Sequence, residues 1–66
     1  MDHYYVNNKA QLTGEHEVHK ENCPYFPSDR NYLGYFSNCR QAVQKALEYH
    51  SNVDGCKTCS PDCHTR

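Results

Sequence analysis

The stretch DGCKTCSPDCHTR, residues 54–66, gathers Cys56, Cys59, Cys63 and His64 within nine residues. Cys56 and Cys59 have C-x2-C spacing, which turns both sulfurs toward one point so that a single metal ion can bind them. Structural zinc sites take four ligands, so this pair is only half of a site. The other half has to come from elsewhere in the chain.

The segment HKENC supplies the matching half, with His19 and Cys23 separated by three residues. We expect this segment where a strand runs into a loop, and a turn there can bring one imidazole and one thiolate together. We therefore predict a Cys3His tetrahedron that suits Zn²⁺. The predicted metal ligands are His19, Cys23, Cys56 and Cys59. Four other residues of ligand type are alternates: His16, Cys39, Cys63 and His64.

The five cysteines do not form a complete disulfide framework, because an odd number leaves one thiol over. The four predicted ligands leave Cys39 and Cys63. These two either form a disulfide under oxidising conditions or act as spare ligands, and their distance decides between the two.

Three other chemistries compete for the same cysteines. Cys59-x3-Cys63-His64 resembles a haem-attachment motif, but the usual spacing is C-x2-C-H. Cys56, Cys59 and Cys63, with Cys23 or Cys39, could give four thiolates for an iron–sulfur cluster. A dithiol oxidoreductase would place its C-x2-C pair at the start of a helix after a strand, whereas this pair follows a predicted helix. The simplest alternative is a solvated His19 with cysteines that act as small buried apolar residues.

The composition predicts one small domain, residues 1–66, that needs a staple. Leu, Val and Phe together number nine, and there is no Ile or Trp. Domains with such thin cores usually rely on disulfides, a metal or oligomerisation. The net charge of −1 argues against disorder, which usually combines low hydrophobicity with high charge.

The charge balance also limits the partners. Seven Lys and Arg are offset by eight Asp and Glu without a basic run, so nucleic-acid binding is an alternative that charge does not support. No stretch is long or apolar enough to span a bilayer, and residues 1–12 lack the pattern of a secretory signal. We therefore expect a cytoplasmic protein with a protein partner and without a membrane role.

The chain reads as a small α+β domain. We predict three strands in an antiparallel sheet, His3–Val6, Glu15–Lys20 and Tyr32–Phe36, where Gly34 marks a bulge or a close backbone approach. One helix, Ser37–His50, packs on this sheet. A cysteine knuckle follows, and Ser60-Pro61-Asp62 resembles the start of a helical turn.

The predicted helix is amphipathic and has a clear start. Ser37 or Asn38 can cap it, and Asn38 with Gln41 has capping-box spacing. Its apolar stripe has spacings of three and four residues. The stripe consists of Cys39, Ala42, Val43, Ala46, Leu47 and His50.

We predict that the protein is not an enzyme. Glu15, Glu17 and Glu21 lie close in sequence to His19, but the sequence does not place one of them as a general base. A zinc ion with four protein ligands also has no open position for a water molecule.

Three segments together resemble the Ada-like metal-binding fold and a set of small stand-alone bacterial proteins. They are EVHKENC, YLGYFSNCRQAVQKA and GCKTC. The resemblance covers about residues 15–64 and rests on His19, Cys23, Phe36, Ala42, Cys56 and Cys59. It implies a zinc-stabilised scaffold of a kind often attached to DNA-active proteins. The methyl-accepting chemistry of Ada needs four cysteines on zinc, so a site that includes His19 does not imply that activity.

We accordingly expect a binding or adaptor module with one structural zinc ion. The alternatives are a disulfide-stapled or redox-active thiol protein, and a nucleic-acid-associated module by analogy with the Ada-like fold.

Overall fold

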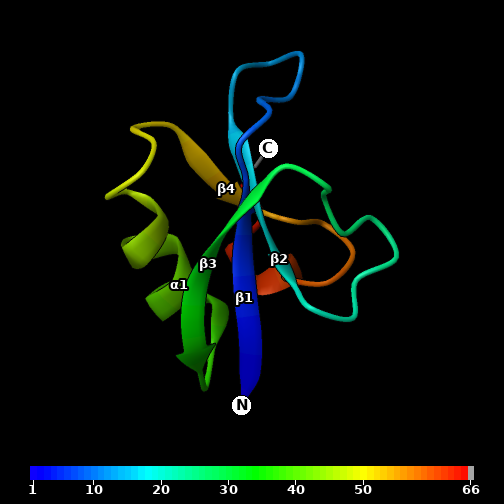
Figure 1. Ribbon diagram of the computed structural model, residues 1–66, viewed down its shortest axis with the longest axis vertical. Helices are drawn as coiled ribbons and strands as arrows, with labels where there is room; N and C mark the ends of the chain where they lie inside the picture. The colour runs from blue at the N-terminus through cyan, green and yellow to red at the C-terminus, as the bar shows by residue number, and fades with distance from the viewer. Residues whose placement is uncertain (66) are drawn as a thin grey trace.

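The computed structural model describes residues 1–65 and contains a four-stranded sheet with one α-helix (Figure 1). In chain order the elements are β1 (Asp2–Asn7), β2 (His16–Lys20), β3 (Arg30–Phe36), α1 (Cys39–Ala46), β4 (Val53–Gly55) and the 3₁₀ turn η1 (Pro61–Cys63). The α+β class with a single helix agrees with the sequence-based prediction.

The sheet has the strand order β3-β1-β2-β4 and is mixed, so the prediction of three antiparallel strands was wrong in part. β1 pairs antiparallel with both β2 and β3. The chain returns after α1 and adds β4 parallel to β2, with Val53 opposite His16. Val-Asp-Gly is too short for an alternating pattern, and Asp and Gly are uncommon in strands, so its sequence gives little sign of a strand.

Gly34 sits beside a register shift between Tyr4 and Tyr5 in the β1–β3 pairing. Its φ of +141° favours glycine, and an added Cβ would lie 2.7 Å from the Phe36 ring. Of the two predicted alternatives, the bulge occurs at this residue, and the ring of Phe36 packs closely against the Gly34 backbone.

α1 begins where the sequence predicts and ends earlier. The side chain of Asn38 caps the helix by accepting a hydrogen bond from the Gln41 backbone N–H. Gln41 does not complete a capping box with Asn38, since its side chain accepts from Ser37 instead. After Ala46 the chain continues in tighter turns, in which Tyr49 N–H donates to the Ala46 carbonyl. Leu47 is 46% exposed, so the predicted apolar stripe does not extend to it.

The core lies between α1 and one face of the sheet. Its buried members are Tyr4, Val6, Val18, Leu33, Cys39, Ala42 and Ala46. Since side chains alternate across a strand, Tyr5, Glu17 and His19 project from the opposite face. Tyr5 and His19 are direct partners in the β1–β2 register. The helix thus covers one face of the sheet, and the loops that follow β2 and β4 come together over the other (Figure 1).

Within residues 1–65, no helix combines the length and the apolar character needed to cross a membrane.

Candidate metal centre

His19 is placed by strand β2. Val18 faces the helix and is fully buried, and the alternation of the strand sends the neighbouring imidazole to the other face. The imidazole does not reach solvent there, because His19 is only 2% exposed. The alternative to the predicted metal ligand, a solvated His19, is therefore wrong.

Cys23 is placed by two tight turns directly after β2. The Cys23 N–H donates to the Lys20 carbonyl over 3.1 Å, and the Phe26 N–H donates to the Cys23 carbonyl over 3.1 Å. These turns fold the chain back over the sheet, so that the thiol of Cys23 lies buried close to His19.

Cys56 and Cys59 form the knuckle after β4. The Cys56 N–H donates to the Val18 carbonyl over 3.0 Å, which continues the parallel pairing and fixes Cys56 beside β2. The Ser60 N–H donates to the Cys56 carbonyl over 2.8 Å and closes the knuckle. The Lys20 N–H points at the Cys59 Sγ over 3.3 Å. Backbone groups of β2 thereby position both knuckle cysteines.

Gly55 allows η1 to lie directly over the end of β4. A Cβ on Gly55 would lie 2.7 Å from the Cys63 Cβ and 2.8 Å from the Ser60 carbonyl oxygen. Because the Ser60 carbonyl is a backbone group, a larger residue at position 55 would push η1 away and open the knuckle.

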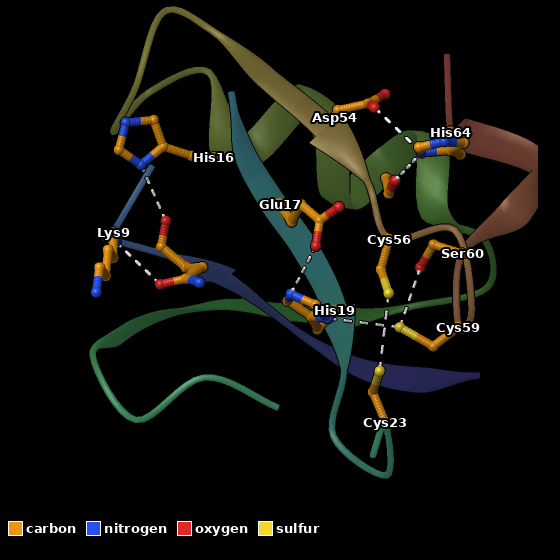
Figure 2. Close-up of polar contacts among 12 residues, drawn as sticks. Lys9, His16, Glu17, His19, Cys23, Asp54, Cys56, Cys59, Ser60 and His64 are labelled. Carbon is orange, nitrogen blue, oxygen red and sulfur yellow. Dashed lines mark hydrogen bonds and ion pairs between the residues drawn. The ribbon is translucent and has the colours of Figure 1, made fainter. Parts of the chain in front are cut away.

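The four predicted ligands converge into one cluster (Figure 2). One ligand atom from each of His19, Cys23, Cys56 and Cys59 lies within 4.8 Å of the other three. The Cys23 and Cys56 sulfurs are 3.8 Å apart, and the His19 Nδ1 is 3.9 Å from the Cys59 Sγ. Around a tetrahedral zinc ion, S–S and N–S separations of about 3.8 Å and about 3.6 Å follow from the ordinary bond lengths. The cluster therefore has nearly the size that one metal ion requires.

Burial gives these residues properties that suit a metal ion. It lowers the pKa of His19, which keeps the imidazole neutral and able to donate a lone pair. Burial also raises the pKa of the Cys59 thiol to about 12. A bound cation would lower the pKa of Cys59 again, because cysteines bind metals as thiolates and metal binding releases their protons.

The alternates lie outside this cluster. Cys39 and Cys63 are joined by a disulfide, which links the first turn of α1 to η1. His16 stacks on His50 with the ring centres 3.7 Å apart. His64 lies beside Asp54, with its Nδ1 3.2 Å from the Asp54 Oδ2 and 3.0 Å from the Gly55 carbonyl oxygen. Three free cysteines remain, one fewer than the four thiolates that an all-cysteine iron–sulfur cluster needs.

Two acidic residues near the centre were not assigned roles by the sequence reasoning. Glu17 approaches the His19 ring from the side opposite to Cys59 (Figure 2). Asp54 is its register partner on β4 and is 2% exposed. The Asp54 Oδ1 accepts hydrogen bonds from the N–H and the hydroxyl of Thr65, both over 2.9 Å. The spacing Glu17-Val18-His19 was a usable signal, because residues two apart in a strand share a face.

No family model, curated protein or solved structure matches this chain. The geometry of the site and the chemistry of its residues are therefore the basis for the functional proposal.

Proposed function

We propose that this chain is a small binding or adaptor module whose fold depends on one structural Zn²⁺ held by His19, Cys23, Cys56 and Cys59. The observation that carries the proposal is the cluster itself: two segments more than thirty residues apart bring four ligand-type side chains within 4.8 Å of one another. Three thiols and one imidazole are a common zinc donor set, whereas calcium and magnesium prefer oxygen ligands.

A structural role fits this donor set better than a catalytic one. Four protein ligands fill a tetrahedral zinc ion and leave no position for a substrate or an activated water. The core is also thin, and structural zinc contributes about 10–16 kcal/mol to the folding of finger peptides. An ion that joins the β2 loop to the knuckle would therefore decide whether the chain folds.

A structural zinc module acts through its surface, so the function we propose is binding. A protein partner is the first choice, because the net charge of −1 offers no general attraction to nucleic acid. The Ada-like resemblance of the sequence supports the same kind of scaffold and is part of this proposal.

Chelation tests the proposal directly. A strong zinc chelator should remove one zinc ion per chain and abolish the far-UV circular dichroism of the fold, and added Zn²⁺ should restore it. Retention of the folded spectrum after complete metal removal would reject the structural role.

The second candidate is a thiol protein stapled by disulfides, and the Cys39–Cys63 bond favours it. In that case reductant would unfold the protein and the chelator would leave it folded. The three remaining thiols lie in one cluster and are not bridged, with 3.8 Å between the Cys23 and Cys56 sulfurs against about 2.05 Å in a disulfide. The spacing fits a shared metal ion better than a second bridge.

A further inference from the structure

The two ring nitrogens of His19 face different neighbours. Its Nδ1 lies 3.9 Å from the Cys59 Sγ, inside the cysteine cluster. Its Nε2 lies 3.5 Å from the Glu17 Oε1. Figure 2 shows the ring between these two groups, with Glu17 on one side and the sulfurs on the other. The ring is therefore held in an orientation that distinguishes its two nitrogens.

A neutral imidazole has one N–H and one lone pair, so a choice of tautomer accompanies metal binding. If the lone pair of Nδ1 points to the metal, the proton must be on Nε2. The Nε2–H can then donate a hydrogen bond to the carboxylate of Glu17. Carboxylates that receive the N–H of a metal-bound histidine fix the ring and make it a stronger ligand.

Glu17 is well placed for this task and does not belong to the ligand cluster. It occupies the same face of β2 as His19, two residues earlier, and its side chain is only 17% exposed. The four clustered residues already complete a tetrahedral set without it. Its carboxylate also has a side-chain hydrogen bond with Gln11, and its Oε1 is the atom that lies beside the 2% exposed His19.

We propose that Glu17 is the positioning residue of the metal centre: it accepts the Nε2–H of His19 and thereby directs Nδ1 to the metal ion. This inference rests on the proposed zinc site. It adds which nitrogen of His19 binds the ion, which tautomer the imidazole adopts, and which carboxylate orients the ring. The 3.5 Å contact is longer than a strong N–H···O hydrogen bond, and we expect it to shorten when the metal polarises the imidazole.

Zinc affinity gives the first test, measured by competition with a chromophoric chelator. Glu17→Ala should bind Zn²⁺ about 10–100-fold more weakly than the wild type. Glu17→Gln keeps a neutral acceptor, so its zinc affinity should lie between those of the wild type and Glu17→Ala. Glu48→Gln removes the same charge from the exposed Lys45–Glu48 pair on the helix side, and it should bind as the wild type does.

The nitrogen-15 NMR spectrum of the zinc-loaded protein gives the second test, since a merely structural role for Glu17 would not set the tautomer. The wild type should show His19 bound through Nδ1, with a low-field and slowly exchanging Nε2–H. In Glu17→Gln this proton signal should move upfield, and in Glu17→Ala it should exchange rapidly.

The outcomes separate the two proposals. A wild type that binds zinc through Nε2, or a Glu17→Ala variant with unchanged affinity, would overturn the role of Glu17 and leave the zinc site intact. If Glu17→Ala does not fold, an unchanged Nε2–H signal in Glu17→Gln would overturn it equally. A wild type that binds no zinc would overturn the proposed function itself.

Discussion

Each candidate ligand occupies a position where its side chain has little access to water. Cys23, Cys56 and His19 are buried, and Cys59 is partly buried. Burial raises the pKa of the Cys59 thiol, so its thiolate requires a nearby cation. The proposed zinc ion supplies that charge, so the loss of one ligand should weaken the binding of the ion as a whole.

Cys56→Ser tests this at a residue that is 3% exposed. The variant should lose zinc on purification and give the circular dichroism of the chelated wild type, because a serine hydroxyl is a poor zinc ligand and the other three ligands do not complete the tetrahedron. Zinc content and the far-UV spectrum are the measurements.

A matched control comes from the other two cysteines. Cys39→Ser/Cys63→Ser removes two sulfurs but none of the four ligands, and it should retain one zinc ion per chain. Loss of zinc in the control, or retention of zinc in Cys56→Ser, would contradict the ligand assignment.

Among the elements, α1 depends on its first turn. Asn38 provides a side-chain cap for the Gln41 N–H, and helix caps of this type contribute about 1 kcal/mol. Asn38→Ala should therefore lower the free energy of unfolding by about 1 kcal/mol, measured by urea denaturation. Ser37→Ala, which loses only an exposed hydroxyl contact with Gln41, should stay within about 0.5 kcal/mol of the wild type. Equal losses in the two variants would contradict the assignment of the cap.

The segment that follows α1 is attached to β2 through two stacked histidines. The His50 Nε2 lies 3.0 Å from the Asn8 Oδ1, and the ring lies parallel to that of His16. Burial, and then the neighbouring His16, lower the pKa of His50 below its usual 6.5. The unfolded chain therefore binds a proton at His50 more readily than the folded chain does. This contribution lowers stability as the pH falls below 6.5.

His50→Gln should reduce this sensitivity to acid. The stability advantage of the wild type over the variant, measured by urea denaturation, should be larger at about pH 7.5 than at about pH 5.5. Titrating groups other than the stacked His16 are common to both proteins and cancel in the comparison. A constant or growing advantage at the lower pH would contradict the assigned direction of the pKa shift.

The sequence predicts those elements that have strong local signals. A helix cap at Ser37 or Asn38, the strands β1, β2 and β3, and the turn at Pro61 all follow from local residue preferences, and the structure has the cap at Asn38. β4 does not, since its three residues become a strand only through parallel pairing with β2. The early end of α1 is a tertiary effect as well, because the chain has to turn back toward that edge of the sheet.

For the site, the spacing of ligand-type residues in the sequence predicts the cluster of four. It does not predict the disulfide or the role of Glu17 beside that cluster. C-x2-C and His-x3-Cys are local patterns, and the fold brings these two pairs together. The contact between Cys39 and Cys63 depends on how η1 lies against α1, which spacing alone does not specify. The role of Glu17 depends on the direction of the imidazole, and this is visible only in the three-dimensional arrangement.

For the molecule as a whole, one cross-link holds the C-terminal segment in place, and the proposed zinc ion would add a second. The disulfide ties η1 to the start of α1, and an ion held by the four clustered residues would tie the knuckle to the β2 loop. Both act on residues 56–63, which otherwise contribute little to the core. The small apolar core is thus supplemented at the point where the chain is least able to pack.

The disulfide should contribute measurably by itself. It closes a loop with a sequence separation of 24, for which restriction of the unfolded chain predicts about 3 kcal/mol. Zinc-loaded Cys39→Ser/Cys63→Ser should therefore unfold with a free energy lower by about 3 kcal/mol than the oxidised wild type. Reduction of the wild type at constant zinc should produce a loss of similar size. No change in either experiment would show that the bond adds nothing to the fold.

Native mass spectrometry of freshly purified protein, without added metal or reductant, shows whether the chain carries the proposed zinc ion. We predict one zinc ion per chain, one disulfide between Cys39 and Cys63, and three cysteines that become reactive to alkylation only after chelation. A folded, metal-free chain lighter by the hydrogens of two disulfides would rule out the zinc site, and the cysteine cluster would then be a covalent staple.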